Sequence, residues 1–281
     1  MTESSRKHWI KKHSLILFLV LTVLISWFPW YTGGSGFFVF GPSIAGVIII
    51  ALTKGKDGLE DLTQRALRWR VGIRWWGVAL FFTGFIGLFS ILLNIFLGGE
   101  MPSFRFFREE WYLIPVFFLL TIIGGPLGEE FGWRGFALPK LQNKWGAMPA
   151  SIILGIIWAL WHLPLFFQEG SIHIQMGFKL LPYYVLGQIA LTTIMTWVYN
   201  KTGGSLLLGG IILHNADNLW ATLLFTSETM TSAFEGGTQA LFDSQLYILA
   251  TLVGVLAAII LAFTTKWKLG FMKSGISKPV N

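Results

Sequence analysis

LTIIGGPLGEEFGWRG, the stretch at residues 120–135, places two adjacent carboxylates and an arginine inside apolar sequence. WYLIPVFFLL leads into this stretch and FALPKLQ follows it. A charged side chain at the centre of a bilayer costs about 2.5–3.5 kcal/mol on insertion scales, so such residues are rare and are mostly functional. The stretch therefore predicts a membrane helix that carries a functional site, provided that the rest of the chain is also suited to lipid.

The composition supports a lipid environment. Of the 281 residues, 54% are hydrophobic and 12% are charged, whereas soluble domains carry about 25% charged residues. Long windows almost without charge recur along the chain, and a membrane-spanning helix needs about 20 apolar residues. These features indicate a membrane protein with several spans and argue against a soluble globular domain. The chain contains no cysteine, which excludes disulfides and thiolate zinc sites.

The pattern of apolar stretches predicts an all-α, polytopic membrane protein with about eight transmembrane helices in a single membrane domain, residues 1–281. The first apolar run resembles a signal peptide, but it continues to about Tyr31 without a small-residue cleavage site, so we expect a retained first span. Residues 57–71 mix apolar and charged side chains and predict an amphipathic helix on the membrane surface. The candidate spans are residues 14–31, 36–53, 74–97, 110–138, 149–167, 181–199, 204–225 and 245–265.

The basic residues predict the orientation of the chain in the cell membrane. If the N-terminus lies in the cytoplasm, all but three of the 21 Lys and Arg residues fall on the cytoplasmic side; the exceptions are Arg105, Arg108 and Lys179. This bias matches the positive-inside rule and places both termini in the cytoplasm. The net charge of +7 is then explained by topology and by anionic lipid, so we expect lipid and not nucleic acid as a partner.

Three of the candidate spans carry polar groups at one depth. These groups lie about 16–22 Å from the expected cytoplasmic boundary at 1.5 Å per helical residue. Glu130 and Arg134 are four residues apart and can pair on one helix face. Glu129 is rotated by about 100° from Glu130, so its carboxylate can serve in chemistry. The groups are Glu129, Glu130 and Arg134 in span 110–138, His162 in span 149–167, and His214, Asn215, Asp217 and Asn218 in span 204–225.

The other polar and aromatic residues have plainer expected roles. His214 and Asn218 share one helix face, whereas Asn215 and Asp217 point away from them and are expected to serve in packing. Trp158 is expected to line the core. The three remaining histidines lie outside the candidate spans and are expected to be solvated: His8, His13 and His173.

Three short motifs resemble those of one enzyme family. GEEFGWRG resembles the EExxxR motif of the CPBP intramembrane proteases, the CAAX-protease and bacteriocin-processing family also called Abi. WALWH resembles the second motif, FxxxH, with Trp158 in place of phenylalanine, and HNADN resembles the third, HxxxN. FGPSIAGVII in the second span also resembles this family. The order and spacing of the motifs match over about 90 residues, and the eight-span layout covers nearly the whole chain.

The resemblance implies an intramembrane endopeptidase that cuts a protein or peptide substrate in a cavity open to the cytoplasmic side. It implies that Glu129 and His162 activate a water, and that His214 and Asn218 stabilise the oxyanion. Glu130 and Arg134 would hold the site in shape. The residues do not name the substrate, because a family match does not transfer one.

The same residues leave other functions open. Glu129, His162 and His214 could also be zinc ligands, because two histidines and a carboxylate form a common catalytic zinc set; a metal-independent mechanism is equally compatible. Buried carboxylates and histidines also form proton relays, so a transporter or ion pathway is an alternative. A non-catalytic immunity or scaffold protein that keeps the fold is another.

Overall fold

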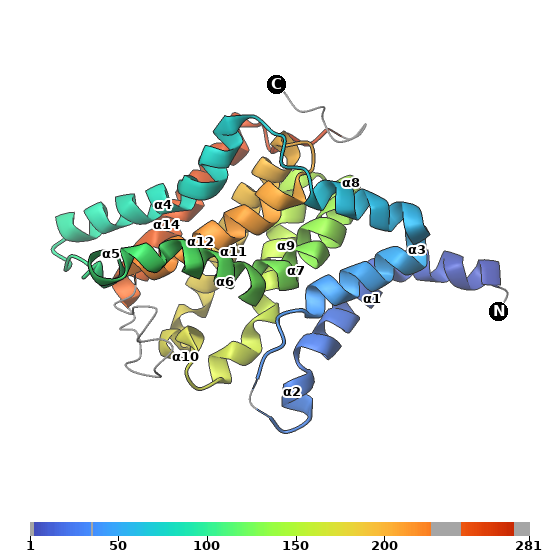
Figure 1. The fold of residues 1–281 in the computed structure, drawn as a ribbon, viewed down its shortest axis with the longest axis horizontal. Helices are drawn as coiled ribbons and strands as arrows, with labels where there is room; N and C mark the ends of the chain where they lie inside the picture. The colour runs from blue at the N-terminus through green and yellow to red at the C-terminus, as the bar shows by residue number, and fades with distance from the viewer. Residues whose placement is uncertain (1–2, 35, 226–242, 273–281) are drawn as a thin grey trace.

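The computed structural model describes residues 3–34, 36–225 and 243–272, and these are mostly helical (Figure 1). No β-strand occurs in these ranges, so the predicted all-α class is confirmed for them. The α-helices are α1 (Glu3–Ser26), α2 (Phe28–Tyr31), α3 (Gly41–Ala66), α4 (Ile73–Phe96), α5 (Arg105–Glu109), α6 (Ile114–Gly124), α7 (Pro126–Gly132), α8 (Leu138–Trp145), α9 (Ala147–Trp161), α10 (Ile172–Met176), α11 (Leu181–Lys201), α12 (Leu213–Phe225) and α14 (Ser244–Thr264). Short 3₁₀ turns η1 (Trp111–Leu113), η3 (Leu163–Phe167) and η4 (Phe178–Leu180) and π-helical turns η2 (Trp133–Ala137) and η5 (Leu207–Ile212) link some of them.

Several helices are suited to crossing a membrane. Among the described residues, four are long and apolar enough: Lys7–Ser26, Ile73–Phe96, Ala147–Phe167 and Ser244–Thr264. A fifth span is possible if Trp111–Gly124 and Pro126–Trp145, which meet at a 45° bend, count as one. The chain is therefore a multi-pass membrane protein. The other expected spans coincide with α3, α11 and the η5–α12 unit, and the total of eight stays a prediction.

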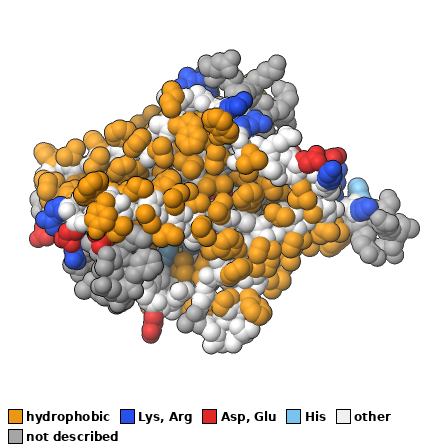
Figure 2. Space-filling model, viewed as in Figure 1, with side chains coloured by type: hydrophobic (Ala, Val, Ile, Leu, Met, Phe, Trp, Pro, Cys, Tyr) orange, Lys and Arg blue, Asp and Glu red, His pale blue; other side chains and the backbone are white. Residues whose placement is uncertain are grey.

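The outer surface of the helices is apolar. Large side chains such as Phe85, Phe96 and Leu256 are more than half exposed. Figure 2 shows hydrophobic side chains over most of the visible face and charged side chains near its margins. Such a surface is unfavourable in water but is suited to lipid, because lipid tails solvate apolar side chains.

The helices pack around α11, which contacts α9, α14 and η5. On one side α1 packs on α3 and α3 packs on α7; on the other, α4 contacts α12 and α14. Gly209 of η5 lies against the backbone of α11, because a Cβ at this position would be 2.5 Å from the Cα of Tyr199. This close approach, which small residues permit between membrane helices, brings the polar residues of α12 toward those of α7 and α9.

The segment expected as an amphipathic surface helix continues α3. The helix bends at Gly55, where φ is 60° and ψ is −146°, and then runs on to Ala66. Leu62 is 3% exposed and packs in the main apolar core, so part of its apolar side faces the protein. A membrane-surface position for this segment and the cytoplasmic position of both termini stay predictions; residues 1–2 and 273–281 lie outside the described residues.

Candidate active site

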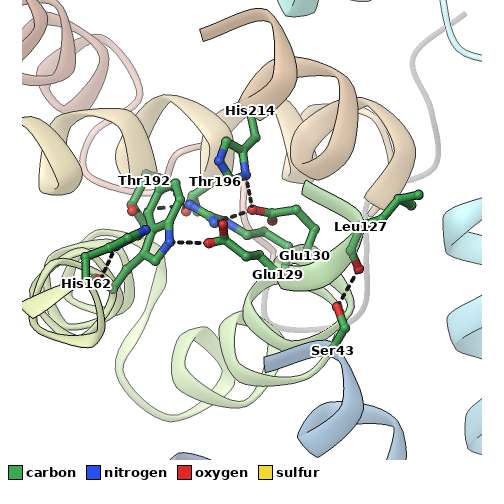
Figure 3. Close-up of polar contacts among 10 residues, drawn as sticks. Ser43, Leu127, Glu129, Glu130, His162, Thr192, Thr196 and His214 are labelled. Carbon is green, nitrogen blue, oxygen red and sulfur yellow. Dashed lines mark hydrogen bonds and ion pairs between the residues drawn. The ribbon is translucent and has the colours of Figure 1, made fainter. Parts of the chain in front are cut away.

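The chain bends where the two glutamates begin. Helix α6 ends at Gly124, and α7 starts at Pro126, whose ring nitrogen has no hydrogen to donate to a preceding turn. The helices on the two sides of this break, Trp111–Gly124 and Pro126–Trp145, meet at a 45° bend. The hydroxyl of Ser43 on α3 donates to the carbonyl of Leu127 at 2.8 Å and so ties α7 to its neighbour (Figure 3).

The Glu130 carboxylate contacts both an arginine and a histidine. Arg134 Nη1 lies 2.8 Å from Glu130 Oε1, as the spacing of four residues predicted. His214 Nδ1 lies 2.8 Å from the same oxygen, although it is 84 positions away in the sequence (Figure 3). Arg134 Nη2 also donates to Thr192 Oγ1 at 3.3 Å. Glu130 and Arg134 are completely buried, so this cluster holds α7, α11 and α12 together away from bulk solvent.

Trp158 joins the other two predicted site residues. Its indole Nε1 donates to Glu129 Oε2 at 2.6 Å, and its backbone carbonyl accepts from His162 Nδ1 at 2.9 Å (Figure 3). The Arg134 guanidinium lies 4.3 Å from the centre of the Trp158 ring, and the His214 ring packs edge-on at 5.0 Å. Trp158 is 1% exposed, as expected for a core residue. Trp158 also contacts Glu129, Arg134, His162 and His214, although it does not contact Glu130. The sequence did not indicate this central position of Trp158.

His162 is surrounded by aromatic rings, and one of them belongs to a second histidine. His173 on α10 stacks on His162 with ring centroids 5.8 Å apart and an interplanar angle of 14°. Burial lowers the pKa of His173 to about 4, so the ring is neutral near pH 7. His173 is only partly exposed and packs against other rings, so it is less solvated than predicted. The sequence signal that could have revealed it is the pair Gly170 and Gly177, which bracket a short helix able to fold back on the site.

An apolar cavity of about 610 Å³ lies beside these residues. Asn218 lines it, whereas Glu129, His162 and His214 do not. Asp217 lines the same cavity as Asn218, which corrects the expectation that the two side chains point apart. Asn215, by contrast, donates to the Phe118 carbonyl at 2.8 Å and has the packing role expected of it. The remaining polar lining includes Thr83, Thr121, Tyr184, Gln188, Tyr247 and Thr251.

The candidate zinc ligands do not converge on one point. Within residues 3–34, 36–225 and 243–272, no three His, Asp or Glu side chains are placed to hold one metal ion. Glu129, His162 and His214 therefore do not fit a shared zinc site in this arrangement.

The chain is similar to CAAX prenyl endopeptidases. A family model described as type II CAAX prenyl endopeptidase Rce1-like matches residues 110–220, which include every predicted site residue from Glu129 to Asn218. The chain is also 30% identical over 235 residues to the "CAAX prenyl protease 2" of Methanococcus maripaludis. That match covers 76% of this chain and 86% of the relative.

Proposed function

The chain belongs to the CPBP family of intramembrane proteases, as a type II CAAX endopeptidase, and we propose that Glu129 and His162 activate the water that hydrolyses its substrate. Family membership makes the chain a hydrolase, so the transporter and scaffold alternatives are not retained. The observation that carries the proposal is the position of Trp158, which holds Glu129 through its indole and His162 through its carbonyl. Two candidate groups for water activation are thus fixed by one residue.

The tautomer of His162 supports its part in the proposal. A carbonyl oxygen can only accept a hydrogen bond, so His162 Nδ1 must carry the hydrogen that it shares with Trp158. In the neutral ring Nε2 then has a lone pair, which can accept a hydrogen bond from water. Glu129 serves as the general base and takes one proton of this water. The water oxygen attacks the scissile carbonyl carbon, and the proton passes to the leaving nitrogen as the C–N bond breaks.

His214 and Asn218 are proposed to stabilise the oxyanion. Glu130 accepts the hydrogen bond from His214 Nδ1, and a carboxylate partner favours an imidazole that carries protons on both nitrogens. Nε2–H of that ring can then donate to the developing negative charge, as can the amide of Asn218 at the cavity wall. Arg134 balances the charge of Glu130 and keeps it in place. No step requires a metal.

The substrate is proposed to be a peptide that carries a long apolar group. The relative in M. maripaludis has the name of a prenyl protease. The cavity beside Asn218 is lined mainly by apolar side chains, among them Ile86, Leu191 and Ile194, and such a surface is suited to an isoprenoid chain. The distribution of Lys and Arg supports an opening toward the cytoplasm.

Purified protein in liposomes tests this function. We expect it to cleave a peptide with an S-farnesylated cysteine near its C-terminus, and Glu129→Gln and His162→Ala each to lower kcat at least about 100-fold, the lower end for positioned acid–base groups. Glu60→Gln and His13→Ala are matched controls outside the site and should keep full activity. Unfolding curves of all variants are measured in parallel. Wild-type kcat in Glu129→Gln would remove this carboxylate from the mechanism.

A further inference from the structure

Helix α10 folds back against His162. Gly170 and Gly177 flank this helix with φ values of +79° and +61°, which residues other than glycine rarely adopt. The Ser171 hydroxyl oxygen caps the helix by accepting from the backbone N–H of His173 at 3.1 Å. Figure 1 shows α10 below α9, near the end of α9 at which His162 lies. The two turns and the cap therefore hold His173 at a defined position.

The ring of His173 has its own fixed orientation. Ser171 Oγ lies 3.0 Å from His173 Nδ1 as well as accepting from the backbone N–H. The hydroxyl oxygen can accept from Nδ1–H as well as from the backbone N–H, or donate to Nδ1, so this contact anchors the Nδ1 edge of the ring in either neutral tautomer. Phe166 packs against His173 at 5.2 Å and Tyr184 packs edge-on at 5.1 Å. The ring is thus held by a hydrogen bond and by two aromatic neighbours.

His162 needs such support because its own hydrogen bond fixes only one atom. The bond from Nδ1 to the Trp158 carbonyl does not by itself set the plane of the ring. His173 and Phe37 both lie nearly parallel to the His162 ring, at 5.8 Å and 5.9 Å. Tyr184 packs edge-on against it at 6.0 Å. The parallel rings restrict the plane of His162 and hence the direction in which Nε2 points.

We propose that His173 is a positioning residue that fixes the ring plane of His162 by stacking. This inference rests on the proposed function, in which His162 Nε2 binds the attacking water. A displacement of about 1 Å at a reacting group can lower a rate by about 100-fold, so the effect should appear in kcat.

Helix α10 also contributes two side chains to the cavity wall. Ile172 and Met176 are four residues apart, share one helix face and both line the cavity. One short helix therefore contacts the proposed substrate site through Met176 and the proposed water-activating residue through His173. The two kinds of contact predict different kinetic effects: Met176→Ala should raise KM, whereas changes at His173 should lower kcat.

Replacements of His173 test the proposal through kcat and KM. We expect His173→Ala to lower kcat about 10- to 100-fold with KM changed less than about threefold, because the ring is misplaced but substrate binding is not. His173→Phe keeps a flat ring and should restore kcat to within about threefold of wild type. Ile174→Ala, which shortens a side chain on the same helix that is 40% exposed, should have no effect. If His173→Ala folds poorly, His173→Leu fills the volume without a flat ring and should lose kcat relative to His173→Phe.

Two outcomes would overturn the proposal. Wild-type kcat in both His173→Ala and His173→Leu would show that stacking is not needed. Equal loss of kcat in His173→Phe and His173→Ala would assign the effect to an imidazole nitrogen instead.

A second readout separates this inference from the proposed function. In protein labelled with ¹⁵N-histidine, the Nδ1–H signal of His162 should be sharp in wild type and in His173→Phe and broadened by exchange in His173→Ala. An unchanged signal in His173→Ala would refute the positioning role. Activity that survives in His162→Ala would refute the proposed function alone, because the signal does not depend on catalysis.

Discussion

Replacing Arg134 with methionine should show how strongly the buried cluster stabilises the fold. Arg134 Nη1 lies 2.8 Å from Glu130 Oε1, and both side chains are 0% exposed. Removing one partner of a buried ion pair costs about 3–5 kcal/mol, because a charge is left buried without compensation. His214 still contacts the Glu130 carboxylate in the variant, so we expect a loss near 3 kcal/mol, at the lower end of this range.

The chain offers a matched control for this change. Arg105 and Glu109 are also four residues apart on a helix, and their ion-pair distance is 2.7 Å, but their side chains are 44% and 47% exposed. Exposed pairs at this spacing contribute about 0.3–0.5 kcal/mol, because water already solvates both charges. Arg105→Met should therefore lower the free energy of unfolding by no more than this amount.

Equilibrium unfolding in mixed detergent micelles measures both variants on the same scale. The peptidase activity of the folded fraction is determined in the same samples. Arg134→Met should lower activity as well as stability, because Glu130 also holds His214. If Arg134→Met costs no more unfolding free energy than Arg105→Met, burial does not strengthen the pair and the reasoning fails.

Three further predictions concern packing, metal dependence and pH. Gly132→Ala should lower the free energy of unfolding by about 1–3 kcal/mol, as overpacking does, because a Cβ would lie 2.2 Å from the Pro42 carbonyl oxygen. Gly77→Ala is the control in the same unfolding assay, because a Cβ at Gly77 meets no atom within 4 Å. Equal stability of the two variants would contradict the expected clash. Peptidase activity should survive dialysis against a strong chelator, and a loss that zinc reverses would contradict the metal-free mechanism. Burial lowers the pKa of His173 to about 4 from 6.5. The unfolded segment therefore binds a proton at a higher pH than the folded segment does. The packing of α10 should weaken as the pH falls from 6.5 toward 4, because protonation favours the unfolded segment. Hydrogen exchange of residues 170–177, corrected for intrinsic rates, should rise in this window in wild type but not in His173→Phe, and a flat wild-type profile would disprove the linkage.

The sequence alone determined the class of protein and the local pairs. The low charge content is a property of the whole chain, so it predicts a membrane protein without any knowledge of packing. The ion pair of Glu130 and Arg134 follows from a spacing of four residues on one helix, since helical geometry fixes which side chains share a face. The ordered motifs around Glu129, His162 and His214 indicated the family, which the comparisons then confirmed.

Only the tertiary structure decided which of these residues touch. His214 contacts Glu130 across 84 positions, and His173 stacks on His162 although it lies outside every expected span. Asp217 lines the cavity because of how α12 packs against α4, which its position on the helix does not specify. Periodicity fixes the direction of a side chain relative to its own helix axis, whereas the neighbour that it meets depends on the packing angles between helices and on close approaches such as that at Gly209.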